Sequence, residues 1–356
     1  MLKQEATLIV AVITAIIGFY VEHSVIEQGG VMLAVAFTLV FSVIIGAAFR
    51  VAYHAEVLAQ RFGEPYGTML LTIAAVTVEV VMLVIIMTGT ENPTLARDTI
   101  YSAIMIDMNG ILGVAAIIGG IHHGEQKYNM DGSNSYISML LVAVGISMFI
   151  PEFISADNMK SYFIFSILVT LILYVIFLRV QTVEHRYFFQ YGGAGGHEET
   201  QSTHQKSNSW HVLLLVFTIV VIGVLAEILA VFLDHGMEAS GLPMAIPAVL
   251  VALISASPEI LTAVRAAMKD QMQTVINIGL GASLATVLLT VPVIEFIALM
   301  QGIPLEMGLT PLQSAMILLT VLVAMINLHD GESNMLEGAV HFALFATFIA
   351  LTFIAG

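Results

Sequence analysis

Eleven stretches of this 356-residue chain are each long and apolar enough to cross a lipid bilayer. A membrane-spanning helix needs about 20 predominantly apolar residues. The chain is 58% hydrophobic and only 10% charged, whereas soluble domains carry about 25% charged residues. We therefore expect an all-α integral membrane protein in which each stretch forms a spanning helix. The stretches are 6–22, 31–53, 67–89, 99–121, 136–155, 161–182, 211–233, 243–268, 272–300, 311–328 and 335–355.

Several other classes of protein do not fit this sequence. No stretch alternates between polar and apolar residues as the strands of a membrane barrel do. The chain contains no cysteine, so disulfides and thiolate metal sites are excluded. No small-residue cleavage site follows the first stretch, which we interpret as a retained helix. No nucleophile occurs with a placed base, so we expect a transporter rather than an enzyme, and no cofactor.

The eleven lysines and arginines predict the orientation. If the N-terminus is cytoplasmic and the stretches alternate in direction, nine basic residues fall inside and two fall outside. Cytoplasmic loops of membrane proteins carry such an excess of positive charge. We therefore expect a multi-pass protein of a prokaryotic cytoplasmic (inner) membrane, with the N-terminus cytoplasmic and the C-terminus outside. The two basic residues outside are Arg97 and Lys160.

Two glutamates lie deep inside apolar stretches, at corresponding places in the two halves of the chain. Glu79 lies in the stretch 67–89, and Glu259 lies in the stretch 246–268. A carboxylate at bilayer depth is costly, so one that occurs there is a functional candidate. The matching positions predict one cation- and proton-binding site built from both halves.

The chain divides at a polar stretch into two sets of five helices. Residues 183–210 are rich in Gly, Ser, Gln and His and read as a cytoplasmic linker. We expect an N-terminal helix in 1–30, a first five-helix repeat in 31–182 and a second in 211–356. Because five is odd, the two repeats have opposite topology, which is the inverted-repeat arrangement of many secondary transporters.

Polar residues near the two glutamates are candidates for the same site. Pro258 cannot donate a hydrogen bond to the Ile254 carbonyl, so that oxygen is free to serve a cation. Ser255 lies one turn before Glu259 on the same face, and Thr72 lies two turns before Glu79.

The helices that follow each glutamate add further candidates. Asp107 and Asn109 are two residues apart and cannot share one face of a regular helix. We favour Asn109 as the residue near the site and leave Asp107 open. Ser283 and Thr286 are candidate oxygen donors on the helix after Glu259.

Three other acidic residues lie in or beside apolar stretches. Glu227 is a candidate proton relay, with Glu56 as its counterpart in the first half. Glu295 lies near the outer end of its stretch and is interpreted as a vestibule group.

Two buried carboxylates predict that a cation is exchanged for protons rather than passing through the protein alone. Burial disfavours the charged form of each carboxyl, so an empty site with two negative charges is poorly tolerated. A site that holds one divalent cation is neutral, and so is a site that holds two protons. Calcium accepts carboxylate, carbonyl and hydroxyl oxygens, about 6–8 in all. A site that holds one monovalent cation and one proton is also neutral. The two carboxylates alone therefore do not determine which cation is bound.

These residues resemble a known superfamily of transporters. The segments GEPYGTMLLTIAAVTVEV (63–80) and SPEILTAVRAAMKDQMQTVINIGLGASLATVLLTVP (257–292) are similar to the paired alpha-repeats of the cation/calcium exchanger superfamily. The combination of RFGEPYG with VEV is most similar to bacterial Cha-type calcium (sodium, potassium)/proton antiporters, as are VLAEIL (224–229) and HDGESNMLEGAVHFALF (329–345). The resemblance implies two inverted five-helix repeats and assigns cation and proton binding to Glu79 and Glu259.

The chain departs from the pattern of the calcium/proton exchangers at three places. Those proteins usually carry Gly-Asn just before each glutamate, where this chain has Ala75-Val76 and Ser255-Ala256. Ala285 replaces a glutamine that is common after the second repeat. These changes remove oxygen ligands and leave room for sodium or potassium.

We therefore expect a proton-coupled antiporter that exports Ca²⁺ in exchange for H⁺ by alternating access. Its partners are membrane lipid and inorganic cations, with no nucleic acid, and the oligomeric state stays open. One alternative is a Na⁺(K⁺)/H⁺ antiporter with Ca²⁺ as a minor substrate. Another, from a different class, is a cation channel, although channels usually build charged rings from several subunits.

Overall fold

The computed structural model describes most of the chain, in ranges separated by short gaps. These ranges are 5–62, 66–89, 92–184, 188, 207–240, 243 and 245–354, and the side chains of 66–68 and 238–240 are also not described. Within them, ten helices are long and apolar enough to cross a membrane, and an eleventh apolar helix, Pro311–Asn327, is shorter. The all-α fold and the positions of the eleven expected stretches are confirmed. The expected linker 183–210 lies mainly outside the described residues.

Seven of the eleven spans are single α-helices. They are α1 (Ala6–Gln28), α2 (Gly30–Phe62), α3 (Tyr66–Gly89), α8 (Asn208–Ser240), α9 (Ile246–Met268), α12 (Pro311–Asn327) and α13 (Met335–Ile354). Helix α9 continues through Pro258, which lies inside it. Helix α12 begins at a capping box, in which the Thr310 hydroxyl accepts from the Gln313 backbone N–H.

The other four spans change helical type along their length. Two of them contain a π-helical turn near their middle, and such turns occur frequently at functional sites. The first of these two carries Asp107 and Asn109 inside its π turn, and in the second Thr286 and Thr290 are the first and last residues of the turn. The segments are α4 (Leu95–Met105), η1 (Ile106–Ile111) and α5 (Leu112–His123); α6 (Met130–Val144), η2 (Gly145–Phe149) and η3 (Ile150–Phe153); α7 (Ala156–Arg179) and η4 (Val180–Glu184); and α10 (Met272–Ala285), η6 (Thr286–Thr290) and α11 (Val291–Gln301).

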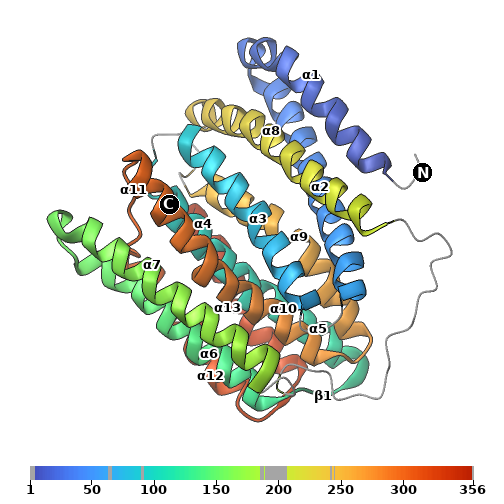
Figure 1. Cartoon of the computed structure of the whole chain (residues 1–356), viewed down its shortest axis with the longest axis vertical. Coiled ribbons are helices and arrows are strands. Elements are labelled where there is room, and N and C mark those ends of the chain that lie inside the picture. The colour runs from blue at the N-terminus through green and yellow to red at the C-terminus, as the bar shows by residue number, and fades with distance from the viewer. Residues whose placement is uncertain are drawn as a thin grey trace.

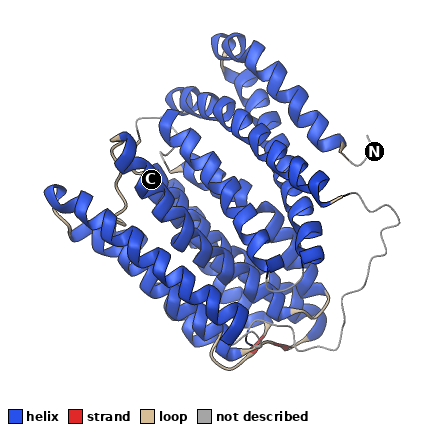
Figure 2. Ribbon diagram, viewed as in Figure 1, coloured by secondary structure: helices blue, strands red, loops and turns tan. Residues whose placement is uncertain are grey.

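The helices lie side by side, with the two halves of the chain interleaved (Figure 1). Helices α1, α2 and α8 form one group, in which each contacts the other two. Helices α3, α4, α9 and α10 lie in the middle, and α7 packs against α11 on the far side. Figure 2 shows that helix accounts for nearly all of the described chain.

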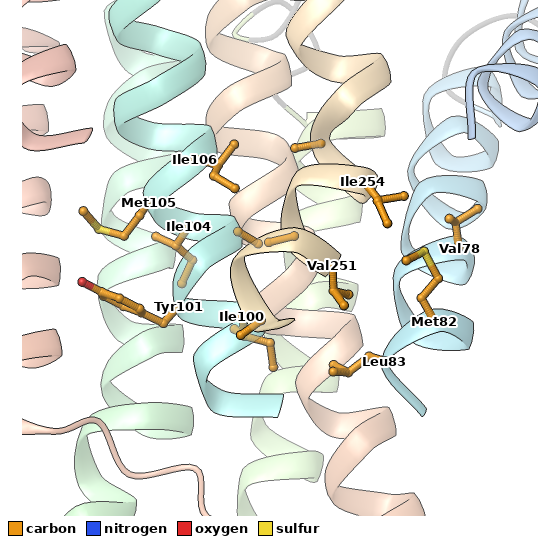
Figure 3. Packing of buried hydrophobic residues seen from close by; sticks show 14 of the residues in the cluster. Val78, Met82, Leu83, Ile100, Tyr101, Ile104, Met105, Ile106, Val251 and Ile254 are labelled. Carbon is orange, nitrogen blue, oxygen red and sulfur yellow. The ribbon is translucent and has the colours of Figure 1, made fainter. Parts of the chain in front are cut away.

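Part of the apolar core lies where α3, α4 and α9 meet (Figure 3). Val78 and Met82 of α3 approach Ile254 and Val251 of α9, respectively, and Ile100 and Ile104 of α4 lie on the other side of α9. All of these side chains are buried. This packing places α9, which carries Glu259, between α3 and α4.

Glycines allow α5 and α13 to approach closely. A Cβ atom on Gly113 would lie 2.7 Å from the Phe342 backbone nitrogen, and one on Gly338 would lie 2.6 Å from that of Ile117. Small residues at such crossings let helix backbones pack directly in membrane proteins. The position of α13 against η1 therefore depends on these glycines.

Two short strands join loops from the two halves. Strand β1 (Gln126–Lys127) pairs antiparallel with β2 (Glu332–Ser333), so that Gln126 lies opposite Ser333. The loops that carry these strands therefore lie on the same side of the helix bundle. The alternating topology expected from the basic residues also places both loops on one side, the cytoplasmic one.

Candidate functional site

Glu79 is a deeply enclosed acidic group at the centre of the bundle. It lies in α3, and its residue is 3% exposed. Its Oε2 atom accepts hydrogen bonds from the hydroxyls of Thr286 and Thr290, each at 2.9 Å. Its Oε1 atom is buried and has no partner among the described residues. One carboxylate oxygen is therefore held by protein, and the other is available to a proton or a cation.

The two threonine donors come from the second half of the chain. Thr286 and Thr290 are four residues apart across η6 and are both buried. Because residues four apart lie close together on a helix, both hydroxyls reach the same oxygen. Thr286 was a candidate donor from the sequence, whereas Thr290 was missed. The spacing of the two threonines was the signal that could have identified it.

Asp107 adds a third carboxyl to this region. It lies in η1, is 2% exposed, and its Oδ2 atom accepts a hydrogen bond from the Ser283 hydroxyl at 3.3 Å. The side chain is close enough to Glu79 and Glu259 for their negative charges to repel its own. The structure therefore brings Asp107 and Ser283 together beside the two glutamates.

Glu259 faces the same region from α9. It is partly exposed, and its charge interacts with that of Glu79. Helix α9 packs against both α3 and η1, which positions Glu259 between the helices of Glu79 and Asp107. Ser255 lies one turn earlier on α9 and is also partly exposed.

Asn109 lies on the other side of η1. Its side-chain NH₂ donates to the Thr320 hydroxyl at 2.8 Å, and its carbonyl oxygen lies 3.1 Å from Nδ1 of His341. These partners belong to α12 and α13, away from the helices that carry the two glutamates. Asp107 and Asn109 occupy different faces, as expected, and in this structure the side chain of Asn109 bonds to α12 and α13 rather than to the glutamates.

Three other predicted residues are not gathered around Glu79. Thr72 lies two turns before Glu79 in α3 and is partly exposed. Glu56 of α2 and Glu227 of α8 are both exposed, and Glu56 accepts a long hydrogen bond of 3.5 Å from Gln60. Neither carboxylate is enclosed by the surrounding helices.

The site therefore offers three carboxylates and three hydroxyls from five helical segments: α3, η1, α9, α10 and η6. Oxygen donors of this kind suit calcium and other hard cations. Across the described residues, however, no group of three histidine, aspartate or glutamate side chains is gathered closely enough to hold one metal ion. The three acids line a common region, and they have to move closer together to share a single ion.

Comparison with known proteins matches nearly the whole chain to one family. The sequence profile described as "Sodium/calcium exchanger protein" matches residues 32–183 and 210–354. The chain is 36% identical over 314 residues to "Putative ionic transporter y4hA" of Sinorhizobium fredii, which covers 86% of this chain and 85% of that protein. It is 33% identical over 316 residues to "Sodium-potassium/proton antiporter ChaA" of Escherichia coli, covering 87% and 86%. It is also 26% identical over 277 residues to a "Ca(2+)/H(+) antiporter" of Aphanothece halophytica, covering 72% and 73%.

Solved structures share the same fold. The structure of YfkE superposes with a TM-score of 0.77 at 19% identity and covers 98% of this chain and 99% of that chain. The H⁺/Ca²⁺ exchanger CAX superposes with a TM-score of 0.70 at 16% identity, covering 98% and 88%.

Proposed function

Because this chain belongs to the sodium/calcium exchanger protein family, we propose that it is a proton-coupled cation antiporter that exports Ca²⁺ in exchange for H⁺. Glu79 and Glu259 bind the cation and the protons in turn, and Asp107 is the third acid of the site. Ser283, Thr286 and Thr290 contribute hydroxyl oxygens, and Ser255 lies beside Glu259 as a further donor. The chain acts as a secondary transporter rather than an enzyme.

One observation carries the proposal. A carboxylate from the first half, Glu79, is enclosed and bonded by two hydroxyls from the second half, Thr286 and Thr290. A change in what Glu79 binds therefore acts directly on a contact between the halves. Alternating access requires such a link, because the bound ion has to influence how the two halves pack.

The charge of the site accounts for obligatory exchange. Three neighbouring carboxylates without a positive partner are strongly disfavoured inside a membrane protein. Three protons neutralise them, and so does one Ca²⁺ with one retained proton. The difference between these two neutral forms is two protons for one Ca²⁺, the same difference that two carboxylates alone would give. We therefore expect at least two protons per Ca²⁺.

A second candidate function is Na⁺(K⁺)/H⁺ exchange, with Ca²⁺ as a minor substrate. The similarity to the sodium-potassium/proton antiporter ChaA over most of the chain favours it. The same neutrality argument then predicts one proton for each monovalent cation. Uptake of Ca²⁺ in the presence of competing Na⁺ or K⁺ separates the two candidates.

We also propose the inverted-repeat organisation and the orientation. The repeats comprise residues 31–182 and 211–356, after an N-terminal helix in 1–30. The N-terminus faces the cytoplasm of a prokaryotic cell, the C-terminus faces outside, and the protein lies in the cytoplasmic membrane. The pairing of β1 with β2 supports the alternation, because it requires two loops from different halves to lie on one side.

The test is transport by the purified protein in lipid vesicles with an imposed pH gradient. We expect Glu79→Gln and Glu259→Gln to abolish pH-driven uptake of Ca²⁺ and Na⁺. Glu306→Gln is the matched control, because Glu306 is an exposed carboxylate in the loop before α12. Transport at the wild-type rate by either of the first two variants would refute the assignment. Cation flux without proton counterflow would instead indicate a channel.

A further inference from the structure

A further buried acid lies outside the site described above. Glu295 of α11 is 0% exposed, and neither of its carboxylate oxygens has a hydrogen-bond partner among the described residues. The interpretation of Glu295 as an outer vestibule group was therefore wrong, because α7 packs over the buried face of α11 and encloses it. Buried polar atoms without partners are rare in native proteins and call for an explanation.

The neighbours of Glu295 supply a hydroxyl but no positive charge. The Ser166 hydroxyl of α7 lies beside the carboxylate and is itself buried without a hydrogen-bond partner. Tyr162 is close enough to interact electrostatically with Glu295, and its hydroxyl donates to the Ile146 carbonyl at 2.7 Å. No lysine, arginine or histidine in the described chain forms an ion pair with Glu295.

The other segments packed against α11 do not neutralise Glu295 either. They are η6 and α3. The turn η6 has no ionisable side chain, and α3 contributes Glu79 among its described side chains. Since Glu79 is also an acid, it cannot compensate a negative charge on Glu295.

The surroundings of Glu295 favour binding of a proton over binding of Ca²⁺. An ionised carboxylate without a positive partner is expensive to enclose within a membrane protein. One proton neutralises one carboxylate, whereas Ca²⁺ would leave an uncompensated positive charge. A protonated Glu295 can donate to the Ser166 hydroxyl, and that bond would give a partner to one carboxyl oxygen and to the hydroxyl.

We propose that Glu295, with Ser166, forms a second proton-binding site, and that its proton is exchanged during the transport cycle. This step rests on the antiporter function proposed above. Glu295 lies five residues after Thr290, which is about 7–8 Å along a helix. Thr290 donates to Glu79 at 2.9 Å, so a change in what Glu79 binds acts on the start of α11.

The segment between the two sites can respond to such a change. Pro292 has no N–H to donate to the Leu288 carbonyl, which interrupts the helical hydrogen bonding between η6 and α11. If a change at Glu79 moves α11 against α7, the surroundings of Glu295 change as well.

The first measurement detects the proton itself. Infrared spectra of the purified protein report the carbonyl stretch of protonated carboxylic acids. We expect Glu295→Gln to lose one such band relative to the wild type, and the control Glu306→Gln to retain all of them. Identical carboxylic-acid bands in Glu295→Gln and the wild type would show that Glu295 is ionised and would overturn the proposal.

The second measurement asks whether the proton moves. In vesicles, we expect the number of protons exchanged per cation to fall by one in Glu295→Gln and to stay at the wild-type value in Glu306→Gln. An unchanged number in Glu295→Gln overturns the exchange of this proton. If the wild type performs no exchange, the proposed function fails, and the infrared comparison still decides whether Glu295 holds a proton. Glutamine has nearly the same size as glutamate, so the variant keeps the packing of α7 on α11.

Discussion

Removing the threonine hydroxyls that hold Glu79 should weaken cation binding by a calculable amount. Thr286 and Thr290 each donate to Oε2 of Glu79 at 2.9 Å. A hydrogen bond to a charged group contributes about 1.5–3 kcal/mol, whereas a bond between neutral groups contributes about 0.5–1.5 kcal/mol. The ionised, cation-binding form of Glu79 therefore gains about 1–1.5 kcal/mol more from each hydroxyl than the protonated form does.

This difference translates into competition between cation and proton. A difference of 1.36 kcal/mol corresponds to a factor of about ten in an equilibrium constant. At fixed pH, Thr286→Val and Thr290→Val should each raise the half-saturating Ca²⁺ concentration about tenfold. The double variant should raise it by less than the product of the two single effects, because both hydroxyls donate to one oxygen. The assay is initial Ca²⁺ uptake into vesicles across a range of Ca²⁺ concentrations.

Two further variants control for the loss of packing. Thr218→Val makes the same change at a buried threonine of α8 that donates to the Leu214 carbonyl of its own helix, so uptake should remain at the wild-type level. Thr290→Ser keeps a hydroxyl and should stay close to the wild type. The reasoning fails if folded Thr286→Val and Thr290→Val saturate at the wild-type Ca²⁺ concentration, or if Thr218→Val weakens uptake as much as they do.

Three other predictions concern η1 and the crossing of α5 with α13. Asp107→Asn should reduce Ca²⁺ uptake more than Na⁺ uptake, because a divalent ion needs more negative charge than a monovalent ion. Asn109→Ala should instead lower the free energy of unfolding by about 1–3 kcal/mol through its lost buried hydrogen bonds, with an unchanged Ca²⁺ to Na⁺ uptake ratio as the check. Gly338→Ala should lower the midpoint of thermal unfolding, because its Cβ would lie 2.6 Å from the Ile117 backbone nitrogen, whereas Gly145→Ala meets no atom within 4 Å and should not. Equal midpoints for these two glycine variants would contradict the close crossing.

The membrane-spanning helices could be predicted from the sequence because their cause is local. Transfer of about 20 consecutive apolar residues into a bilayer is favourable whatever the neighbouring helices are. Each expected stretch therefore coincides with a helical span, although the ends shift by several residues, as in α2 (Gly30–Phe62) against the expected 31–53. The π-helical turns within the spans were not expected, because hydropathy does not distinguish one helical type from another.

It was harder to predict which face of each helix points toward the site than to predict the helices themselves. Asp107 and Asn109 both lie in η1, where the π-helical turn changes the rotation of successive side chains relative to a regular α-helix. The sequence required the two residues to point in different directions, and it could not say which one faced Glu79. Similarly, Glu295 was placed at an open vestibule because nothing in its own segment shows that α7 covers it.

The amino-acid sequence by itself determined that the chain crosses the membrane repeatedly, and it singled out Glu79 and Glu259. Both results follow from the cost of placing polar atoms among lipid chains, which depends on the residues of one segment alone. Only the tertiary structure decided which groups meet these glutamates. The contacts of Glu79 with Thr286 and Thr290 join residues more than 200 positions apart, and they depend on how α3 and η6 are rotated and packed. That rotation is set by the side chains of all the surrounding helices together.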